Sequence, residues 1–142
     1  MVDTSADLQL KDIAVGSRAS FSHRVTVEDV DRFARLSGDM NPLHTDEDYA
    51  SNTSFGQRVV HGMFLASLLS RMVGMHLPGR RCLYLSQSLD FVQPVFIGDT
   101  VQVSVEVLQK QEATKTLVLR TEIHSPPDKL VVRGKAHVQV LE

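Results

Sequence analysis

The sequence contains a single cysteine, Cys82, and no apolar run long enough to cross a bilayer. One cysteine cannot close an intrachain disulfide, which favours a reducing compartment. The longest apolar stretch, MFLASLLSRMVGMHL, is interrupted by serine, arginine and histidine and is too short for a comfortable span. The N-terminal residues MVDTSADLQLKD are acidic and lack the apolar core of a secretory signal. We therefore expect a soluble cytoplasmic protein, or a mitochondrial matrix protein if a leader has been removed.

Clustered positive charge is also missing. Lys and Arg are scattered along a chain whose formal net charge is -2, so we expect no surface for nucleic acid or for an anionic membrane. The sequence has no glycine-rich phosphate loop, no GxSxG motif, and no histidine or cysteine set with metal-binding spacing. The acidic residues between positions 39 and 48 do not have EF-hand spacing. No metal and no redox cofactor is therefore expected.

The composition is that of an ordinary globular protein. Hydrophobic residues make up 42% of the 142 residues and charged residues 23%, values typical of a packed domain rather than a disordered chain. The length fits one domain. We expect a single domain over residues 1–142, in which residues 1–17 form a loosely ordered lead-in closed by Gly16.

Two helices are predicted from capping residues and apolar spacing. Thr26 and Asp29 have the spacing of a capping box, apolar residues then recur on one helical face, and a glycine ends the helix. The second helix spans His61–His76 and is apolar nearly all round, which predicts burial on every side. Between the two helices, Pro42 disfavours helical backbone at the preceding residue, so residues 39–44 should form an ordered loop.

The second half of the chain alternates apolar and polar residues, as strands with one buried face do. The alternation covers residues 83–91, 101–107, 117–123 and 132–140, and a further short strand is predicted over 18–25. The connections around Glu112 and at Pro126-Pro127 are short enough for hairpins. This pattern predicts an α+β fold in which an antiparallel sheet wraps around the long central helix. Because a sheet covers only one side of a helix, the apolar helix also predicts cover by a second subunit.

The loop Asp39–His44 carries a carboxylate and an imidazole five positions apart. General acid–base catalysis needs two groups within hydrogen-bond reach of one proton donor, and a loop stiffened by Pro42 can bring Asp39 and His44 to the same water. The simpler interpretation makes Asp39 a turn former and His44 a solvated loop residue. On these two residues alone, the simpler interpretation is favoured.

The start of the long helix offers a second candidate group. The backbone N–H of Gly62, with the helix dipole behind it, can stabilise a developing oxyanion, and the missing side chain lets a carbonyl approach closely. Alternatively, Gly62 is small only so that the helix can pack, and His61 is a structural histidine. Ser67 and Ser70 either cap carbonyls of the preceding turn or hold a histidine ring or a water in the site.

Taken together, these stretches resemble a known family. Ser37–His44 followed by Val60–Met63 is similar to the MaoC-like dehydratases, specifically the short (R)-specific enoyl-CoA hydratases. The likeness covers nearly the whole chain after about residue 13 and continues through residues 65–70, 77–79, 84–89 and 94–99. Mitochondrial 3-hydroxyacyl-thioester dehydratases of fatty acid synthesis are equally similar at these positions. A resemblance of this extent is far more specific than any single motif.

The resemblance implies a hot-dog fold, a homodimer, and an acyl chain held in a tunnel beside the long helix. It implies that Asp39 and His44 are the catalytic pair, that Gly62 provides the oxyanion amide, and that Ser70 supports the site. Asn41 matches the family's loop asparagine, which fixes the loop rather than doing chemistry. The implied substrate is an acyl-CoA or an acyl-ACP, and no cofactor is needed.

The implied reaction is (R)-specific hydration of trans-2-enoyl thioesters and the reverse dehydration of (3R)-hydroxyacyl thioesters, a hydro-lyase activity in fatty acid metabolism. Two alternatives stay open, because one fold hosts several activities. A hot-dog acyl thioesterase would attack the carbonyl and would not need both Asp39 and His44. A non-catalytic acyl-thioester-binding partner subunit would not need these residues or Gly62 intact.

Overall fold

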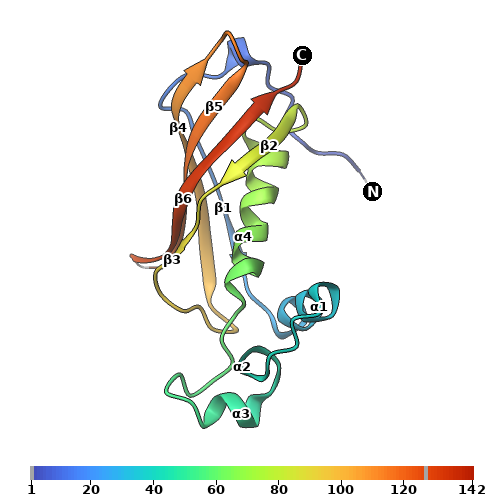
Figure 1. Cartoon of the computed structure of the whole chain (residues 1–142), viewed down its shortest axis with the longest axis vertical. Coiled ribbons are helices and arrows are strands. Elements are labelled where there is room, and N and C mark those ends of the chain that lie inside the picture. The colour runs from blue at the N-terminus through green and yellow to red at the C-terminus, as the bar shows by residue number, and fades with distance from the viewer. Residues whose placement is uncertain (1, 127) are drawn as a thin grey trace.

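The computed structural model describes residues 2–126 and 128–142 and is built around one antiparallel sheet (Figure 1). Its strands are β1 (Arg18–Arg24), β2 (Cys82–Gln87), β3 (Asp90–Phe91), β4 (Thr100–Gln111), β5 (Thr116–Ser125) and β6 (Lys129–Val140). The order is β1-β4-β5-β6-β2, and β3 pairs with β6 beyond the end of β2. All strand pairings are antiparallel, as the alternating sequence predicted.

Alternation along the strands decides which face of the sheet is buried. In β4, Val101, Val103, Val105 and Val107 are buried and the residues between them are more exposed. The turn between β4 and β5 is closed by a hydrogen bond from the Lys115 N–H to the Glu112 carbonyl (3.2 Å), which confirms the first predicted hairpin. The second predicted turn includes Pro127, which lies outside the described residues.

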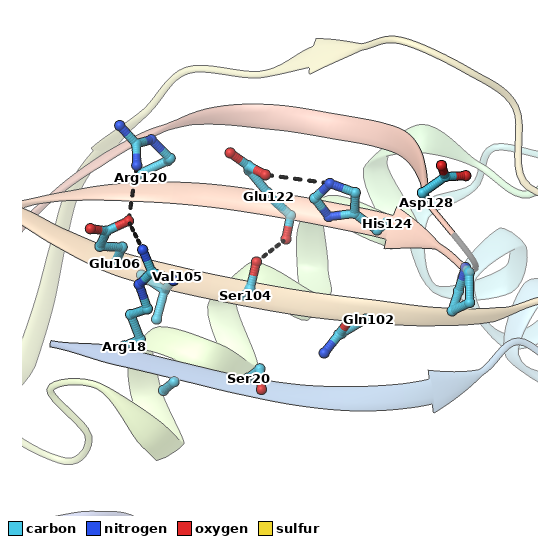
Figure 2. Close-up of a pocket in the computed structure, with 12 residues that line it drawn as sticks. Arg18, Ser20, Gln102, Ser104, Val105, Glu106, Arg120, Glu122, His124 and Asp128 are labelled. Carbon is cyan, nitrogen blue, oxygen red and sulfur yellow. Dashed lines mark hydrogen bonds and ion pairs between the residues drawn. The ribbon is translucent and has the colours of Figure 1, made fainter. Parts of the chain in front are cut away.

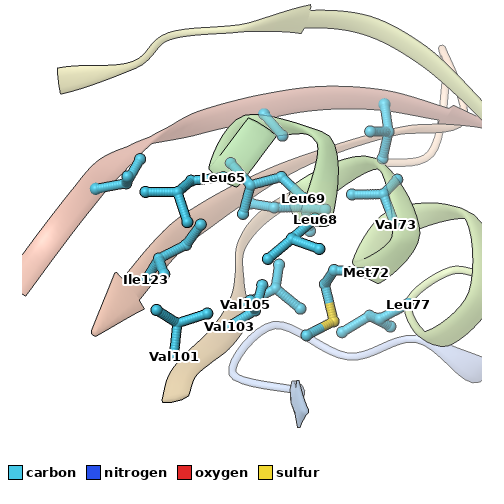
Figure 3. Packing of buried hydrophobic residues seen from close by; sticks show 14 of the residues in the cluster. Leu65, Leu68, Leu69, Met72, Val73, Leu77, Val101, Val103, Val105 and Ile123 are labelled. Atoms are coloured by element: carbon cyan, nitrogen blue, oxygen red, sulfur yellow. The ribbon is translucent and has the colours of Figure 1, made fainter. Parts of the chain in front are cut away.

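The long helix lies along the inner face of the sheet. It consists of α4 (Gly62–Arg71), which continues as a π-helical segment, η2 (Met72–His76). Leu65, Leu69 and Met72 of this helix are buried against the inward valines of β4 and Ile123 of β5 (Figure 3). A side chain of this size contributes roughly 1.5–3 kcal/mol when it is fully buried, so this contact fixes the helix to the sheet. The predicted α+β arrangement is confirmed.

One face of the helix remains open, so the prediction of burial on every side is wrong for a single chain. Met63 is 58% exposed, and Ser67 and Ser70 are also exposed. These residues are four and three positions apart, so they share one face of the helix. Within one chain, the sheet packs against the opposite face of the helix, where its buried residues lie.

The shorter helices precede the long one. They are η1 (Leu10–Asp12), α1 (Val27–Ser37), α2 (Pro42–Thr45) and α3 (Glu47–Ser51). The predicted capping box is confirmed, since the Thr26 hydroxyl accepts the Asp29 N–H and the Asp29 carboxylate accepts the Thr26 N–H. Among the described residues, no helix combines the length and the apolar character that crossing a membrane requires.

Within the segment before β1, for which a loosely ordered lead-in over residues 1–17 is predicted, the structure packs residues 10–13 against the core. Leu10 and Ile13 are buried in the main core. The Leu10 N–H donates to the Glu142 carboxylate at 2.8 Å, and the Lys110 ammonium donates to the Ile13 carbonyl at 2.9 Å. Both partners are far away in sequence, which is why local composition did not reveal this packing.

Candidate active site

The loop that follows α1 is held by its own side chains. Gly38 ends the helix in the left-handed region with φ 81°, and the Ser37 hydroxyl accepts the Asp39 N–H at 3.1 Å. The Asp39 carboxylate accepts the Asn41 N–H at 3.2 Å. Asn41 in turn caps α2, its side-chain oxygen accepting the Leu43 N–H at 2.9 Å. Asn41 therefore fixes the loop, as the resemblance implied.

The predicted ordered loop is confirmed, with one difference. Residues 42–45 form a helical turn, α2, because Pro42 occupies its first position, where its fixed φ suits a helix and no N–H is needed. Asn41 itself stays non-helical, with φ -52° and ψ 130°. This turn places His44 on a short rigid element rather than on an extended loop.

Two hydrogen bonds orient the His44 ring and its backbone. The ring Nδ1 lies 2.6 Å from the Val59 carbonyl oxygen. A carbonyl only accepts, so Nδ1 carries the proton, and Nε2 is left for the substrate side. The buried Arg58 donates from Nε to the His44 carbonyl (2.6 Å) and from its guanidinium to Asp31 of α1 (2.5 Å). Sequence reasoning missed Arg58, because its partners are 14 and 27 positions away.

His61 lies directly beside the two predicted catalytic residues. Its ring stacks on His44 with centroids 4.0 Å apart and planes at 26°, and its Nε2 lies 3.1 Å from the Asp39 carbonyl oxygen. One ligand-type atom from each of Asp39, His44 and His61 falls within 4.8 Å of the other two. The fold thus brings Asp39 and His44 together, as predicted, and adds His61 to them.

This group is a poor candidate for a metal centre. His44 and His61 each use one ring nitrogen on a backbone carbonyl. The remaining nitrogen of His61, Nδ1, is fully buried and has no partner among the described residues. Burial lowers the pKa of the His61 imidazole, and the charges of His44 and Arg58 lower it further, against the opposing effect of Asp39. The arrangement suits proton transfer by Asp39 and His44 better than cation binding.

Gly62 opens α4 at the edge of a cavity. As the first residue of the helix, it has no partner for its N–H within the helix. A Cβ at this position would lie 2.8 Å from two ring carbons of Phe91, so a larger residue would force this ring to move. The cavity, about 400 Å³, is lined by His44, Gly62, Leu65, Phe91 and Val95, with Phe55, Val59, Val60, Met63, Val92, Gln93 and Pro94 around them.

Ser70 is the one predicted site residue that lies apart in a single chain. It follows Gly62 by eight positions, about 12 Å along a helix, and it is exposed on the open face of α4. Ser67 donates its hydroxyl to the Phe64 carbonyl at 2.5 Å, which is the backbone-capping alternative. The structure therefore places Asp39 beside His44, and His44 with Gly62 on one cavity, but it does not bring Ser70 to them.

A second, larger hollow of about 660 Å³ lies on the outer face of β1, β4 and β5 (Figure 2). Its walls carry ion pairs of Arg18 and Arg120 with Glu106, and of His124 with Glu122. None of the predicted site residues lines it. Ion pairs of this kind are expected on the wet face of a sheet.

Comparison with known proteins places the chain in a family. The model of the MaoC-like domain matches residues 12–126, so this chain belongs to the MaoC-like family, and the predicted family and hot-dog fold are confirmed.

Individual relatives cover nearly the whole chain. An (R)-specific enoyl-CoA hydratase of Aeromonas caviae is 42% identical over 94% of this chain and 99% of its own. A 3-hydroxybutyryl-CoA dehydratase of Methylorubrum extorquens is 38% identical over 94% of this chain and 84% of its own. An R-hydratase of Pseudomonas aeruginosa, solved in the unliganded form, superimposes with a TM-score of 0.93 at 34% identity, covering 97% of this chain and 88% of that one.

Proposed function

We propose that this protein is a hydro-lyase that adds water across the 2,3 double bond of trans-2-enoyl thioesters to give (3R)-hydroxyacyl thioesters, and that catalyses the reverse dehydration. The observation that carries this proposal is that His44 and Gly62 line one cavity and that Asp39 lies directly beside His44. The similarity to an (R)-specific hydratase over 94% of the chain supports the same reaction.

Hydration needs three things: a water aligned with C3, a proton for C2, and stabilisation of the enolate oxygen. Asp39 and His44 hold the water between them, and one of its protons passes through this pair to C2 while the hydroxyl bonds to C3. The Gly62 N–H donates to the thioester oxygen, on which negative charge develops. Loss of one such donor typically costs about 2.7–4 kcal/mol of transition-state stabilisation.

The walls of the cavity suit an acyl chain. Leu65, Phe91 and Val95 present apolar surface next to Gly62, and an apolar wall strengthens the hydrogen bond to the thioester oxygen by excluding water. The carrier is coenzyme A in the similar hydratase and acyl carrier protein in a mitochondrial relative. We propose acyl-CoA as the substrate, with acyl-ACP as the other carrier that fits the same site.

A homodimer completes the fold in this proposal. The open face of α4 carries the exposed Met63, and the edge strand β2 exposes Leu83 and Leu85, which are 47% and 52% accessible. Apolar side chains beside an unpaired strand edge form a surface that usually meets a partner. A second copy over this surface would bury the face of the helix that also carries Ser70, so that Ser70 supports a site enclosed by two chains.

The rival activities make different demands on these residues. A thioesterase directs water to the carbonyl carbon rather than to C3, and it releases a thiol. A non-catalytic partner subunit does not need the Asp39/His44 pair or the Gly62 N–H next to it. The convergence of Asp39, His44 and Gly62 therefore favours the hydratase over both alternatives.

Incubation with crotonyl-CoA tests the activity directly. We expect the enoyl absorbance to fall without release of free thiol, and chiral analysis of the product to give the 3R alcohol. Thiol release would identify a thioesterase instead, a 3S product would contradict the proposed stereochemistry, and an unchanged substrate would indicate a non-catalytic subunit.

Replacement of the catalytic pair tests the mechanism. Asp39→Asn keeps the shape of the side chain but removes its basicity, and His44→Ala removes the imidazole. Each change should lower kcat by about 10²–10⁴-fold, and the double variant should be little worse than either single one, because the two groups act as a unit.

Two variants serve as matched controls for the pair. Asp48→Asn lies on α3 in the same connection, and His124→Ala lies on the outer face of the sheet, where His124 pairs with Glu122. Both should retain wild-type kcat. Near-normal turnover of folded Asp39→Asn would contradict the mechanism.

The dimer is tested by light scattering at micromolar concentration. We expect the mass of two chains, because the exposed leucines of β2 and the open face of α4 need cover. Leu85→Glu should weaken the association by placing a charge in the interface, whereas Leu36→Glu, at an exposed position of α1, should not. A stable wild-type monomer would contradict the prediction.

A further inference from the structure

We propose that His61 is a positioning residue that holds both members of the catalytic pair, one through a hydrogen bond to the Asp39 backbone and the other through stacking on the His44 ring. This inference rests on the proposed hydratase function. It gives a role in the reaction to a residue that sequence reasoning treated as structural.

The first contact fixes Asp39. The His61 Nε2 lies 3.1 Å from the Asp39 carbonyl oxygen, and because a carbonyl only accepts, Nε2 must be the protonated nitrogen. The carboxylate of Asp39 is exposed, and within the described residues its hydrogen bond is to the Asn41 N–H. Its position therefore depends on where the backbone of Asp39 is held, and His61 holds that backbone from the protein interior.

The second contact fixes the plane of His44. The hydrogen bond to the Val59 carbonyl restrains the ring at one edge, and the face of His61, 4.0 Å away, restrains it from one side. His61 cannot move away, because Phe33 of α1 packs edge-on against it with centroids 4.9 Å apart. Together, the hydrogen bond and the stacking contact fix the direction in which Nε2 of His44 points.

His61 also connects the pair to the oxyanion amide. It is the N-cap of α4, and its carbonyl accepts the N–H groups of Phe64 (3.1 Å) and Leu65 (3.3 Å). The Gly62 N–H is the next backbone group along the chain. One residue thus relates the positions of Asp39, His44 and Gly62, which are the groups that must be aligned on the substrate.

The protonation state of the His61 ring suits a residue that positions the catalytic pair without exchanging protons itself. With Nε2 donating to the Asp39 carbonyl, the neutral ring leaves a lone pair on Nδ1, which is buried without a partner among the described residues. A proton there would create a buried, unpaired cation. The charged or titratable groups around the ring are Asp39, His44 and Arg58, and burial is the main reason that the pKa of His61 is lowered. His44 can therefore gain a proton without a second imidazolium stacked on it.

Three variants separate a positioning role from a merely structural one. His61→Ala loses both contacts, His61→Gln keeps a donor near the position of Nε2, and His61→Phe keeps the stacked ring. Misplacement by about 1 Å can cost about 10²-fold in rate, so we expect a loss of this size in kcat for His61→Ala with little change in KM. His61→Gln and His61→Phe should each recover part of the loss.

The matched control is His76→Ala. His76 is half-buried and stacks on Phe21 (5.3 Å), at the other end of the helical segment. Its removal should leave kcat unchanged. If folded His61→Ala retains wild-type kcat, or if neither His61→Gln nor His61→Phe has a higher kcat than His61→Ala, the proposal is overturned.

A second readout does not depend on activity, so failure of the proposed function and failure of this inference can be distinguished. ¹⁵N spectra of the imidazoles should show His61 as the neutral Nε2–H form at pH 7. They should also show His44 resonances that shift in His61→Ala. A protonated His61 at pH 7, the opposite tautomer, or an unchanged His44 signal would each contradict the inference, even if crotonyl-CoA is not a substrate.

Discussion

The site depends on the contact between two short segments, the loop at residues 39–44 and the residues that lead into α4. Two hydrogen bonds join the segments. The His44 ring of the loop donates to the Val59 carbonyl, and the His61 ring before α4 donates to the Asp39 carbonyl. The Val59 N–H also donates to the Leu43 carbonyl at 3.1 Å. These bonds lie in a partly buried region, where a hydrogen bond is stronger and an unmade one costs more. The segments therefore hold each other in a single arrangement.

The sheet, β3 and α1 hold the two segments in place. The sheet buries the apolar face of α4 and so fixes where the helix begins, which sets the position of the Gly62 N–H. Phe91 of β3 covers that residue so closely that a side chain there would force its ring to move. Arg58 connects the turn that carries His44 to α1, through its hydrogen bonds to the His44 carbonyl and to Asp31. Catalytic groups on loops can be aligned to this degree only when rigid elements restrain them on several sides.

Local patterns predicted much of this architecture. The valine alternation of β4, the capping box at Thr26 and the turn at Pro42 are each encoded within a few neighbouring positions. The roles of Asp39, His44 and Gly62 were implied only by the resemblance of longer stretches to a family. The role of Arg58 and the burial of Leu10 were not predictable in this way, because their hydrogen-bond partners are far away in sequence. The same local sequence is equally compatible with an Arg58 and a Leu10 that are exposed to solvent. The helix was predicted to be buried on every side because hydropathy reports the total apolar surface, not which chain covers it.

The central claim is that the thioester binds between the Gly62 amide and the Asp39/His44 pair. A crystal structure of inactive Asp39→Asn with bound crotonyl-CoA tests this claim most directly. We expect the thioester oxygen to lie within hydrogen-bond distance of the Gly62 nitrogen and C3 to face the side chains at positions 39 and 44. An acyl group in the hollow on the outer face of the sheet, or a thioester oxygen turned away from Gly62, would contradict it.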